Sequence, residues 1–429
     1  MIRFIYNLLW PIGLLLFLPG YLVKMFRRGG YREKFGERLG IYDRHLRARL
    51  YWKKPIWLHA VSVGEATIAL KLAKQIRALE PDQNFVLTIT TTTGFAFANR
   101  NATDGIDVMY SPLDFWSIMR RGFEAIRPKK IVLVEAEVWP NMVAEATARK
   151  VPIALANARL SPRSKKRFRR FRKFVSPTFR QLDLVCVQNA NDVEEWKALG
   201  VDERKIRHLG SIKFDPEDAR VDPKLPRTVL AEFGLQNRTV IFGGSTHAGE
   251  EKVLGEVFRA LRRDFVDLLL VIAPRHVERT AEVQREMLEM DFNVALRSQP
   301  PVADPFLNCL IIDTTGELRD WYTAATLVFV GKSLLAQGGQ NPAEAILAGK
   351  PVLFGPHMEN FAALASGLLA QEGAVQINSA TELRRAMTHL LANPDEREKM
   401  AENARAVLEI HRGATARTAQ LIVDLVKAD

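Results

Sequence analysis

The sequence is poor in cysteine, with only Cys186 and Cys309 among 429 residues. Both lie in apolar runs that are typical of buried strands. Two cysteines are too few for a disulfide framework or for a zinc site of the usual kind. Their scarcity is in keeping with a reducing, cytoplasmic location.

The sequence also lacks the motifs of several common ligand sites. No Asp-x-Asp pair ends a predicted strand, and no His/Cys cluster has the spacing of metal ligands. We therefore predict no metal and no cofactor. Neither a Walker loop nor a Gly-x-Gly-x-x-Gly fingerprint is present, which argues against ATP and dinucleotide binding.

Composition, length and net charge indicate a folded protein, the number of its domains and the kind of partner that it binds. Hydrophobic residues make up 47% and charged residues 26% of the chain, which is typical of a folded protein. A chain of 429 residues is long enough for two or three domains. The net charge of +12 predicts an acidic partner, which could be a nucleic acid, an anionic membrane or a phosphorylated substrate.

The N-terminal segment predicts a membrane anchor at residues 1–30. Residues 4–23 carry no charge, and about 20 apolar residues can cross a bilayer core. Basic residues from Lys24 onward follow this stretch, so the positive-inside rule places the body of the chain in the cytoplasm. Pro11 and Pro19 interrupt a straight helix, and a segment lying in the membrane interface is the alternative.

The rest of the chain alternates between apolar strands and amphipathic helices. This pattern predicts an α/β fold with parallel, doubly wound sheets. A polar, proline-rich stretch predicts a linker between two Rossmann-like domains, which would face each other across a cleft at the ends of their strands. The predicted strands are 56–61, 85–89, 130–134, 184–187, 240–242, 268–272, 310–312, 327–330 and 352–354, and the predicted segments are 31–212, a linker at 213–226, 227–400 and a helical segment at 401–429.

Carboxylates follow two strands of the first predicted domain. Glu65 starts a helix after a small-residue turn that contains Ser62 and Gly64. A carboxylate there can take a proton from an acceptor hydroxyl, or it can merely complement the helix dipole. Glu135 and Glu137 follow another strand, where they can orient an acceptor or a catalytic group, or cap the next helix.

Glycine-rich turns and an arginine follow strands of the second predicted domain. Residues 243–251 contain Ser245 and Thr246 and precede a helix, so backbone amides there can bind a phosphate. Arg275 comes directly after Pro274 at a strand end and can grip a phosphate or carboxylate. Residues 338–344 form another glycine-rich turn, and the alternative for these features is a purely structural turn.

A basic segment lies at residues 163–173, where eight of eleven residues are Lys or Arg. Phenylalanines interleave with these cations at helical spacing. We expect a helix that binds a membrane surface or a lipid phosphate, with Arg163, Lys166 and Arg170 among its contacts. Nucleic acid and a plain solvated helix are the alternatives.

These motifs, in this order, resemble those of the 3-deoxy-D-manno-octulosonic acid (Kdo) transferases, which move Kdo from CMP-Kdo to the lipid A precursor. The resemblance covers nearly the whole chain. The matching motifs are HAVSVGE at 59–65, VEAEVWPN at 134–141, LANARLSPRS at 155–164, GSIKFD at 210–215, GSTHAGEE at 244–251, APRH at 273–276, DTTGEL at 313–318, GGQNPAEA at 338–345 and GKPVLFGPHMENF at 349–361.

The resemblance implies a GT-B fold and inverting, metal-independent transfer to lipid IVA at the cytoplasmic side of the inner membrane. It implies Glu65 as the catalytic base, with Glu135 and Glu137 beside it. It further implies that Lys213 meets the carboxylate of Kdo. The nucleotide residues that it implies are Ser245, Thr246, Arg275, Asn341 and Glu344. We add Ser62, Gly64, Pro274 and Gly339 as candidate substrate-binding residues beside them.

The sequence departs from the family pattern at four positions, which are Ala136, Ser211, Lys332 and Gln340. No departure removes a candidate carboxylate or Arg275. The implied partners are CMP-Kdo, the lipid A precursor and an anionic membrane surface, with no nucleic acid. The alternatives are a GT-B lipid glycosyltransferase that uses a UDP-sugar, and a non-catalytic basic protein that binds membranes or nucleic acid.

Overall fold

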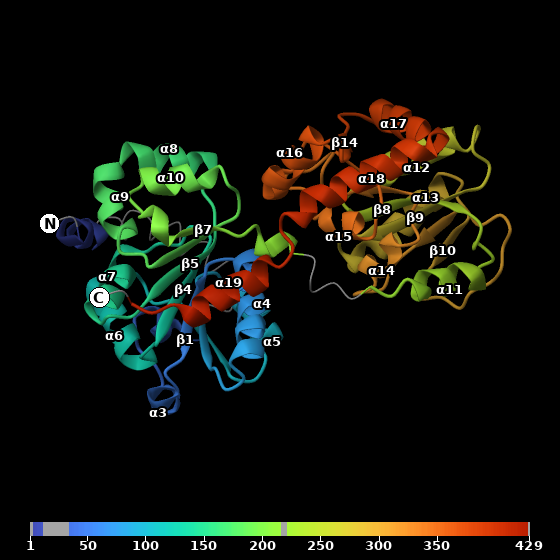
Figure 1. The fold of residues 1–429 in the computed structure, drawn as a ribbon. Coiled ribbons are helices and arrows are strands. Elements are labelled where there is room, and N and C mark those ends of the chain that lie inside the picture. Colours follow the sequence, from blue (N-terminus) through green and yellow to red (C-terminus); the bar gives the residue numbers. More distant parts are fainter. Residues whose placement is uncertain (1–2, 12–33, 216–220, 428–429) are drawn as a thin grey trace. The chain divides into compact units, whose positions relative to one another are not determined.

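The computed structural model describes residues 3–11, 34–215 and 221–427, and the chain divides into two units. The first unit comprises Met1–Asp215 and His411–Asp429, and the second comprises Pro216–Ile410. Each unit contains a parallel sheet of seven strands with helices packed against it (Figure 1). The predicted α/β class with two doubly wound sheets is confirmed.

The sheet of the first unit has the strand order β3-β2-β1-β4-β5-β6-β7. Neighbouring strands pair in parallel throughout. The strands are β1 (Ile56–Ala60), β2 (Phe85–Ile89), β3 (Ile106–Tyr110), β4 (Lys130–Val134), β5 (Ile153–Ala158), β6 (Leu184–Val187) and β7 (Ile206–His208).

Helices connect these strands, as parallel pairing requires. Two 3-10 helices, η1 (Glu203–Lys205) and η2 (Ile212–Phe214), flank β7. The α-helices are α2 (Phe35–Arg38), α3 (Arg44–Lys53), α4 (Val63–Leu79), α5 (Thr92–Asn101), α6 (Trp116–Ile126), α7 (Pro140–Ala148), α8 (Pro162–Arg170), α9 (Arg172–Phe179), α10 (Asp192–Ala198) and α19 (Ala414–Asp424).

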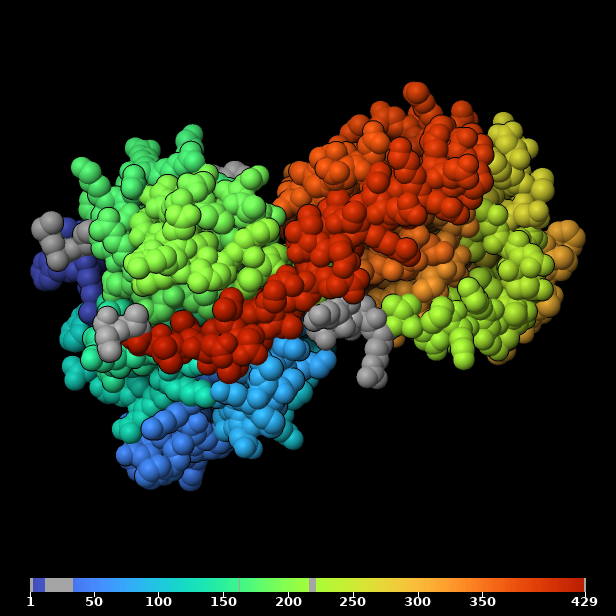
Figure 2. Space-filling view, in the orientation of Figure 1, coloured from blue at the N-terminus to red at the C-terminus, as the bar shows by residue number. Residues whose placement is uncertain are grey.

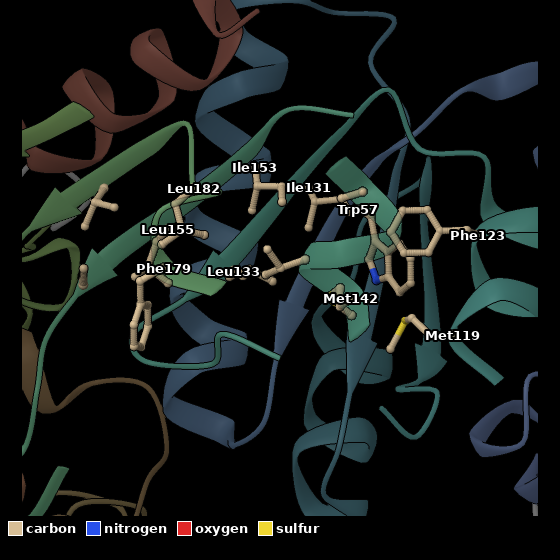
Figure 3. Packing of buried hydrophobic residues seen from close by; sticks show 14 of the residues in the cluster. Trp57, Met119, Phe123, Ile131, Leu133, Met142, Ile153, Leu155, Phe179 and Leu182 are labelled. Atoms are coloured by element: carbon tan, nitrogen blue, oxygen red, sulfur yellow. The ribbon is translucent and has the colours of Figure 1, made fainter. Parts of the chain in front are cut away.

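Successive side chains of a strand point to opposite faces of the sheet. Both faces are buried, because helices pack against each of them. Trp57 packs edge-on against Phe123 of α6 with ring centroids 5.1 Å apart, and its Nε1 donates to Thr88 Oγ1 at 2.8 Å. Figure 3 shows this ring pair beside Met119. Leu58 points to the other face, into the cluster that α4 and α19 cover.

The sheet of the second unit has the strand order β10-β11-β9-β8-β12-β13-β14 and is also parallel. Its strands are β8 (Thr239–Thr246), β9 (Leu268–Pro274), β10 (Val294–Leu296), β11 (Cys309–Ile311), β12 (Leu327–Val330), β13 (Val352–Phe354) and β14 (Ala374–Gln376). Its helices are α11 (Lys224–Glu232), α12 (Glu250–Leu261), η4 (Val277–Arg279), α13 (Thr280–Glu289), α14 (Leu318–Tyr322), α15 (Ala343–Leu347), η5 (Glu359–Phe361), α16 (Ala362–Ala370), α17 (Ala380–Ala392) and α18 (Pro394–Glu409).

The C-terminal helix α19 returns to the first unit, whereas the sequence suggested one helical segment at 401–429. Its apolar face joins the core beside α4, and the space-filling view shows it in red against the blue and green segments of that unit (Figure 2). Asp215 caps its start by accepting bonds from Gly413 N at 3.0 Å and Thr415 N at 2.7 Å. Lys130 Nζ donates to the carbonyl of Ile422 at 2.8 Å near its end.

Residues 3–11 form a helix that docks on the first unit. Arg3 donates to Asn141 Oδ1 and to Glu145, both at 2.9 Å. The side chain of Asn7 accepts from Asn141 Nδ2 at 2.9 Å. The start of the predicted anchor is therefore tied to α7.

The remainder of that anchor, residues 12–30, lies outside the described residues. Within residues 3–11, 34–215 and 221–427, no helix has the length and apolar character needed to cross a bilayer. The predicted linker at 213–226 is shorter at both ends, since η2 includes Lys213 and α11 starts at Lys224.

The two bonds of Asp215 predict a local effect of its removal. Asp215→Ala should destabilise α19 by about 1 kcal/mol, which is typical for loss of a helix cap. Amide hydrogen exchange in residues 414–424 should then speed up roughly fivefold. Asp82→Ala, in an exposed turn of the same unit, is the control. Unchanged protection of α19 in Asp215→Ala would mean that the cap does not hold this helix.

Candidate functional site

The first candidate site lies at the switch point of the first sheet, between β1 and β4. On either side of this point the strand order runs in opposite directions, and ligands bind at such points in doubly wound sheets. Glu65 follows β1, whereas Glu135 and Glu137 follow β4. The fold therefore brings the three candidate carboxylates to one place.

Glu65 takes part in a reciprocal cap at the start of α4. Ser62 is the N-cap residue, and its Oγ accepts a hydrogen bond from Glu65 N at 3.4 Å. The Glu65 carboxylate accepts from Val61 N and from Ser62 Oγ, both at 2.8 Å. Each carboxylate oxygen retains a lone pair for a ligand. The capping role is therefore present, and it leaves room for a catalytic one.

The surroundings of Glu65 suit proton transfer. The residue is 9% exposed, and burial raises its pKa while the hydrogen bonds from Val61 and Ser62 oppose this effect. Gly64 is exposed in the first turn, and a Cβ there would meet only Ser62 Oγ at 4.0 Å. The space above this turn is therefore open to a substrate.

Glu135 and Glu137 form the other half of the carboxylate cluster. Glu135 has a φ of 60°, a conformation that non-glycine residues rarely adopt, and it accepts a bond from Arg159 Nε at 2.9 Å. Burial and the nearby charge of Glu65 raise the pKa of Glu137 to about 7. A group with such a pKa can exchange protons near neutral pH.

Lys213 lies in η2 of the first unit rather than in a linker. Asn157 holds this segment, since its Oδ1 accepts a bond from Ile212 N at 2.9 Å. Burial lowers the pKa of Lys213, and the carboxylate of Glu135 opposes this shift. The candidate ligand of a sugar carboxylate therefore belongs to the same cluster as the candidate base.

The second candidate site lies at the switch point of the second sheet, between β8 and β12. Its loops are held by the fully buried carboxylate of Glu250, the first residue of α12. This carboxylate accepts four backbone N–H bonds, from His247 at 3.0 Å, Lys332 at 2.7 Å, Ser333 at 3.0 Å and Leu334 at 3.1 Å. Glu250 therefore joins the loops that follow the two strands.

Four of the residues predicted to bind the nucleotide-sugar lie near the switch point of the second sheet. Ser245, with a φ of 55°, and Thr246 end β8, and Pro274 ends β9. Thr246 Oγ1 is buried without a hydrogen-bond partner among the described residues, which makes it available to a ligand. Arg275 is exposed, and its N donates to Thr246 O at 3.0 Å. The structure thus places Arg275 beside the glycine-rich turn.

Of the other three candidates, Gly339 and Asn341 lie in the turn before α15, and Glu344 lies in the first turn of that helix. Gly339 has a φ of 67°, and a Cβ there would meet Met358 Sδ at 2.6 Å, so only glycine fits. Asn341 Oδ1 accepts a bond from Ala343 N at 3.1 Å. Glu344 accepts a bond from Arg319 Nε at 2.9 Å. These contacts shape the turn, and they give Glu344 an ion-pair partner that the sequence did not indicate.

The basic segment forms two helices, because the chain breaks at Phe171 between α8 and α9. Arg163, Lys166 and Arg170 are exposed on α8. Two other cations of this segment are paired, as Lys165 binds Asp192 at 2.8 Å and Arg169 binds Glu195 at 2.7 Å. The single helix expected from the sequence is therefore wrong, whereas the exposed cations are present.

No metal site accompanies these residues in the described part of the chain. There, no group of three or more His, Cys, Asp or Glu side chains is arranged to hold a metal ion. The rings of His247 and His276 lie together, with centroids 5.8 Å apart. Two imidazoles can donate or accept hydrogen bonds, and they fall short of a usual zinc ligand set.

Comparisons with known proteins agree with the motifs. A family model described as 3-deoxy-D-manno-octulosonic-acid transferase (kdotransferase) matches residues 33–216. The 3-deoxy-D-manno-octulosonic acid transferase of Haemophilus influenzae is 30% identical over 400 residues, covering 92% of this chain and 91% of that protein. The Bordetella pertussis protein of the same name is 34% identical over 379 residues, covering 86% of this chain and 87% of that protein.

The chain belongs to the Kdo transferase family. Its fold is of the GT-B kind. The structure of S. aureus MnaA with UDP has the same fold, with a TM-score of 0.55 and 15% identity, and covers 88% of this chain and 98% of that one. Lys332, one of the four departures from the family pattern, has a φ of 56°, a conformation that non-glycine residues rarely adopt.

The sequence did not single out several residues that hold the two candidate sites in place. Arg159 pairs with Glu135, Asn157 holds η2, and Glu250 holds the loops of the second site. Arg159 and Asn157 lie within LANARLSPRS and Glu250 within GSTHAGEE. Their place in these motifs was a signal, but their partners are distant in sequence and appear only in the fold.

The raised pKa of Glu137 predicts a pH-dependent stability. An acid with a pKa raised to about 7 stabilises the fold most when protonated, so this contribution is lost as pH rises from about 4.5 through about 7. Glu137→Gln should remove the loss. Its melting temperature relative to the wild type should therefore increase between pH 5 and pH 8.

Thermal unfolding across this range measures the difference. Glu124→Gln, an exposed carboxylate of the same unit, is the control. A constant difference between Glu137→Gln and the wild type would contradict the raised pKa.

Proposed function

We propose that this protein is an inverting, metal-independent glycosyltransferase that moves Kdo from CMP-Kdo to the lipid A precursor, lipid IVA, in lipopolysaccharide biosynthesis. Membership of the Kdo transferase family supports the donor and the transferred sugar. The observation that carries the proposal is the cluster of Glu65, Glu135, Glu137 and Lys213 at the switch point of the first sheet.

In this proposal Glu65 is the general base. A sugar hydroxyl is too weak an acid to lose its proton before attack, so the base must act in the transition state. The hydroxyl oxygen forms a bond to the anomeric carbon of Kdo as its proton passes to the Glu65 carboxylate. The bond from that carbon to the phosphate oxygen breaks, and its electron pair leaves with CMP. Attack from the opposite side inverts the anomeric centre.

The second unit would hold the CMP part of the donor. The glycine-rich turn after β8 and the exposed Arg275 suit a phosphate. A nucleoside monophosphate carries one phosphate, so its departure needs less neutralisation than that of a diphosphate. Hydrogen bonds from side chains and backbone amides can supply this neutralisation without a metal. Transfer then requires the two units to bring donor and acceptor together.

The acceptor would be reached at the cytoplasmic face of the inner membrane. The basic segment favours this location, since Arg163, Lys166 and Arg170 are exposed on α8 and can bind anionic headgroups. The apolar N-terminal segment and its basic flank point in the same direction. Lipid phosphates of the acceptor would meet the same cations.

A substitution at Glu65 tests the catalytic assignment. Glu65→Gln keeps the shape of the side chain and removes its basicity. Turnover of CMP-Kdo with lipid IVA should fall at least about a hundredfold, since general base catalysis typically contributes 10²- to 10⁴-fold. The thermal shift induced by CMP should persist, because the nucleotide would bind the second unit.

Arg275→Ala is the matched comparison and should lose most of the CMP-induced shift. Full turnover in Glu65→Gln would place the base elsewhere, with Glu137 as the next candidate. A joint loss of turnover and of the CMP shift in Glu65→Gln would mean that Glu65 serves only the fold.

A further inference from the structure

A cavity of about 740 Å³ opens beside Glu137 in the first unit. Its walls come from the N-terminal helix, from the turn that joins β4 to α7, and from α8 and α9. Figure 1 shows the N-terminal helix next to α9. The lining is mainly apolar and includes Ile5, Leu9, Val138, Trp139, Phe171 and Phe174. Its volume lies within the range of about 300–1,000 Å³ that is usual for ligand sites.

The break between α8 and α9 gives the phenylalanines of the basic segment different roles. Phe168 packs edge-on against Phe179 with centroids 5.4 Å apart, so it contacts the core, and both residues also line the cavity. Phe171 and Phe174 are 48% and 53% exposed, respectively, and both line the cavity. Apolar side chains left exposed together commonly mark a binding surface.

Three charged side chains lie among the apolar residues that line this cavity. Arg3 and Arg167 line the cavity, and Glu137 is the one acid among the lining residues that the structure describes. Arg167 lies close enough to lower the pKa of Glu137. The exposed cations Arg163 and Arg170 continue along α8. A ligand that suits this arrangement has an apolar chain and an anionic headgroup.

We propose that the cavity binds an acyl chain of the lipid acceptor and thereby positions its sugar hydroxyl at the carboxylate cluster. This inference rests on the proposed function. The cavity leads from the apolar helix at residues 3–11 to Glu137, whose pKa is sensitive to the charge of Glu65. Each further methylene buried in it strengthens binding about fourfold.

The continuity with the carboxylate cluster favours the acceptor over bulk membrane lipid. A phospholipid chain in the cavity would bring its own headgroup to Glu137 and block the acceptor. The acceptor instead needs a hydroxyl at this point and phosphates near the cations of α8. Binding of the acyl chain in the cavity would therefore fix the position of the reacting sugar hydroxyl relative to the carboxylate cluster.

A substitution that fills the cavity tests this assignment. Ala144 lines it from α7, whereas Ala148 is exposed four residues later on the same helix and does not line it. We compare Ala144→Phe and Ala148→Phe in the full-length protein in detergent micelles. The acceptors are the tetraacylated disaccharide bisphosphate and its fully deacylated form, each with CMP-Kdo.

The ratio of kcat/KM for the acylated acceptor to that for the deacylated acceptor should fall at least tenfold in Ala144→Phe. The ratio should stay within twofold of wild type in Ala148→Phe. An unchanged ratio in Ala144→Phe would overturn the proposal. Equal falls in both variants would also overturn it, because the effect would not come from the cavity.

A binding measurement separates this inference from the proposed function. A diazirine-bearing tetradecyl phosphate should photolabel residues 138–144 or 171–178 of the wild type and of Ala148→Phe, and not those of Ala144→Phe. The tetraacylated acceptor should compete with the label. Absent labelling, or competition by phosphatidylglycerol vesicles but not by the acceptor, would overturn the assignment. Failure of the wild type to transfer Kdo would refute the proposed function alone.

Discussion

At the switch point of each sheet, a buried glutamate in the first turn of a helix fixes the loop that precedes this helix. Backbone N–H groups beyond the end of a parallel strand lose their ladder partners, and a buried donor without an acceptor is costly. Glu65 supplies an acceptor for Val61 in the first unit. Glu250 supplies acceptors for four N–H groups in the second. Glu65 lies in the first turn of α4 and Glu250 is the first residue of α12, so each residue ties the loop after a strand to the helix that follows it.

The two glutamates differ in what remains available to a ligand. Glu250 is fully buried, and its four backbone bonds occupy its lone pairs. Glu65 accepts two bonds, is 9% exposed and shares its surroundings with Glu135 and Glu137. Glu250 therefore has a structural role only, whereas Glu65 can still accept a proton from a ligand. Burial, and after it the charge of Glu65, raises the pKa of Glu137 to about 7, a value that suits proton exchange near neutral pH.

Much of this fold follows from local sequence, whereas the contacts that complete it do not. The strands at 85–89 and 327–330 were predicted with their observed limits, because a short continuous apolar run between two helices is typical of a buried strand. Strand β5 (Ile153–Ala158) was missed because it is rich in alanine, which has low strand propensity. The start of α19 is capped by Asp215, and the segment of η2 is bonded to Asn157. These partners are distant in sequence, and local patterns carry no information on such pairings.

We propose above that the carboxylate cluster belongs to an enzyme that transfers Kdo to a phosphorylated lipid. Mass spectrometry of the products tests it most directly, with full-length protein, the tetraacylated disaccharide bisphosphate and either CMP-Kdo or UDP-N-acetylglucosamine as donor. A Kdo transferase should give a lipid heavier by one or more Kdo units, with release of CMP, and no product from the UDP-sugar. A glycosylated lipid formed from the UDP-sugar, or an unchanged lipid with CMP-Kdo, would contradict it.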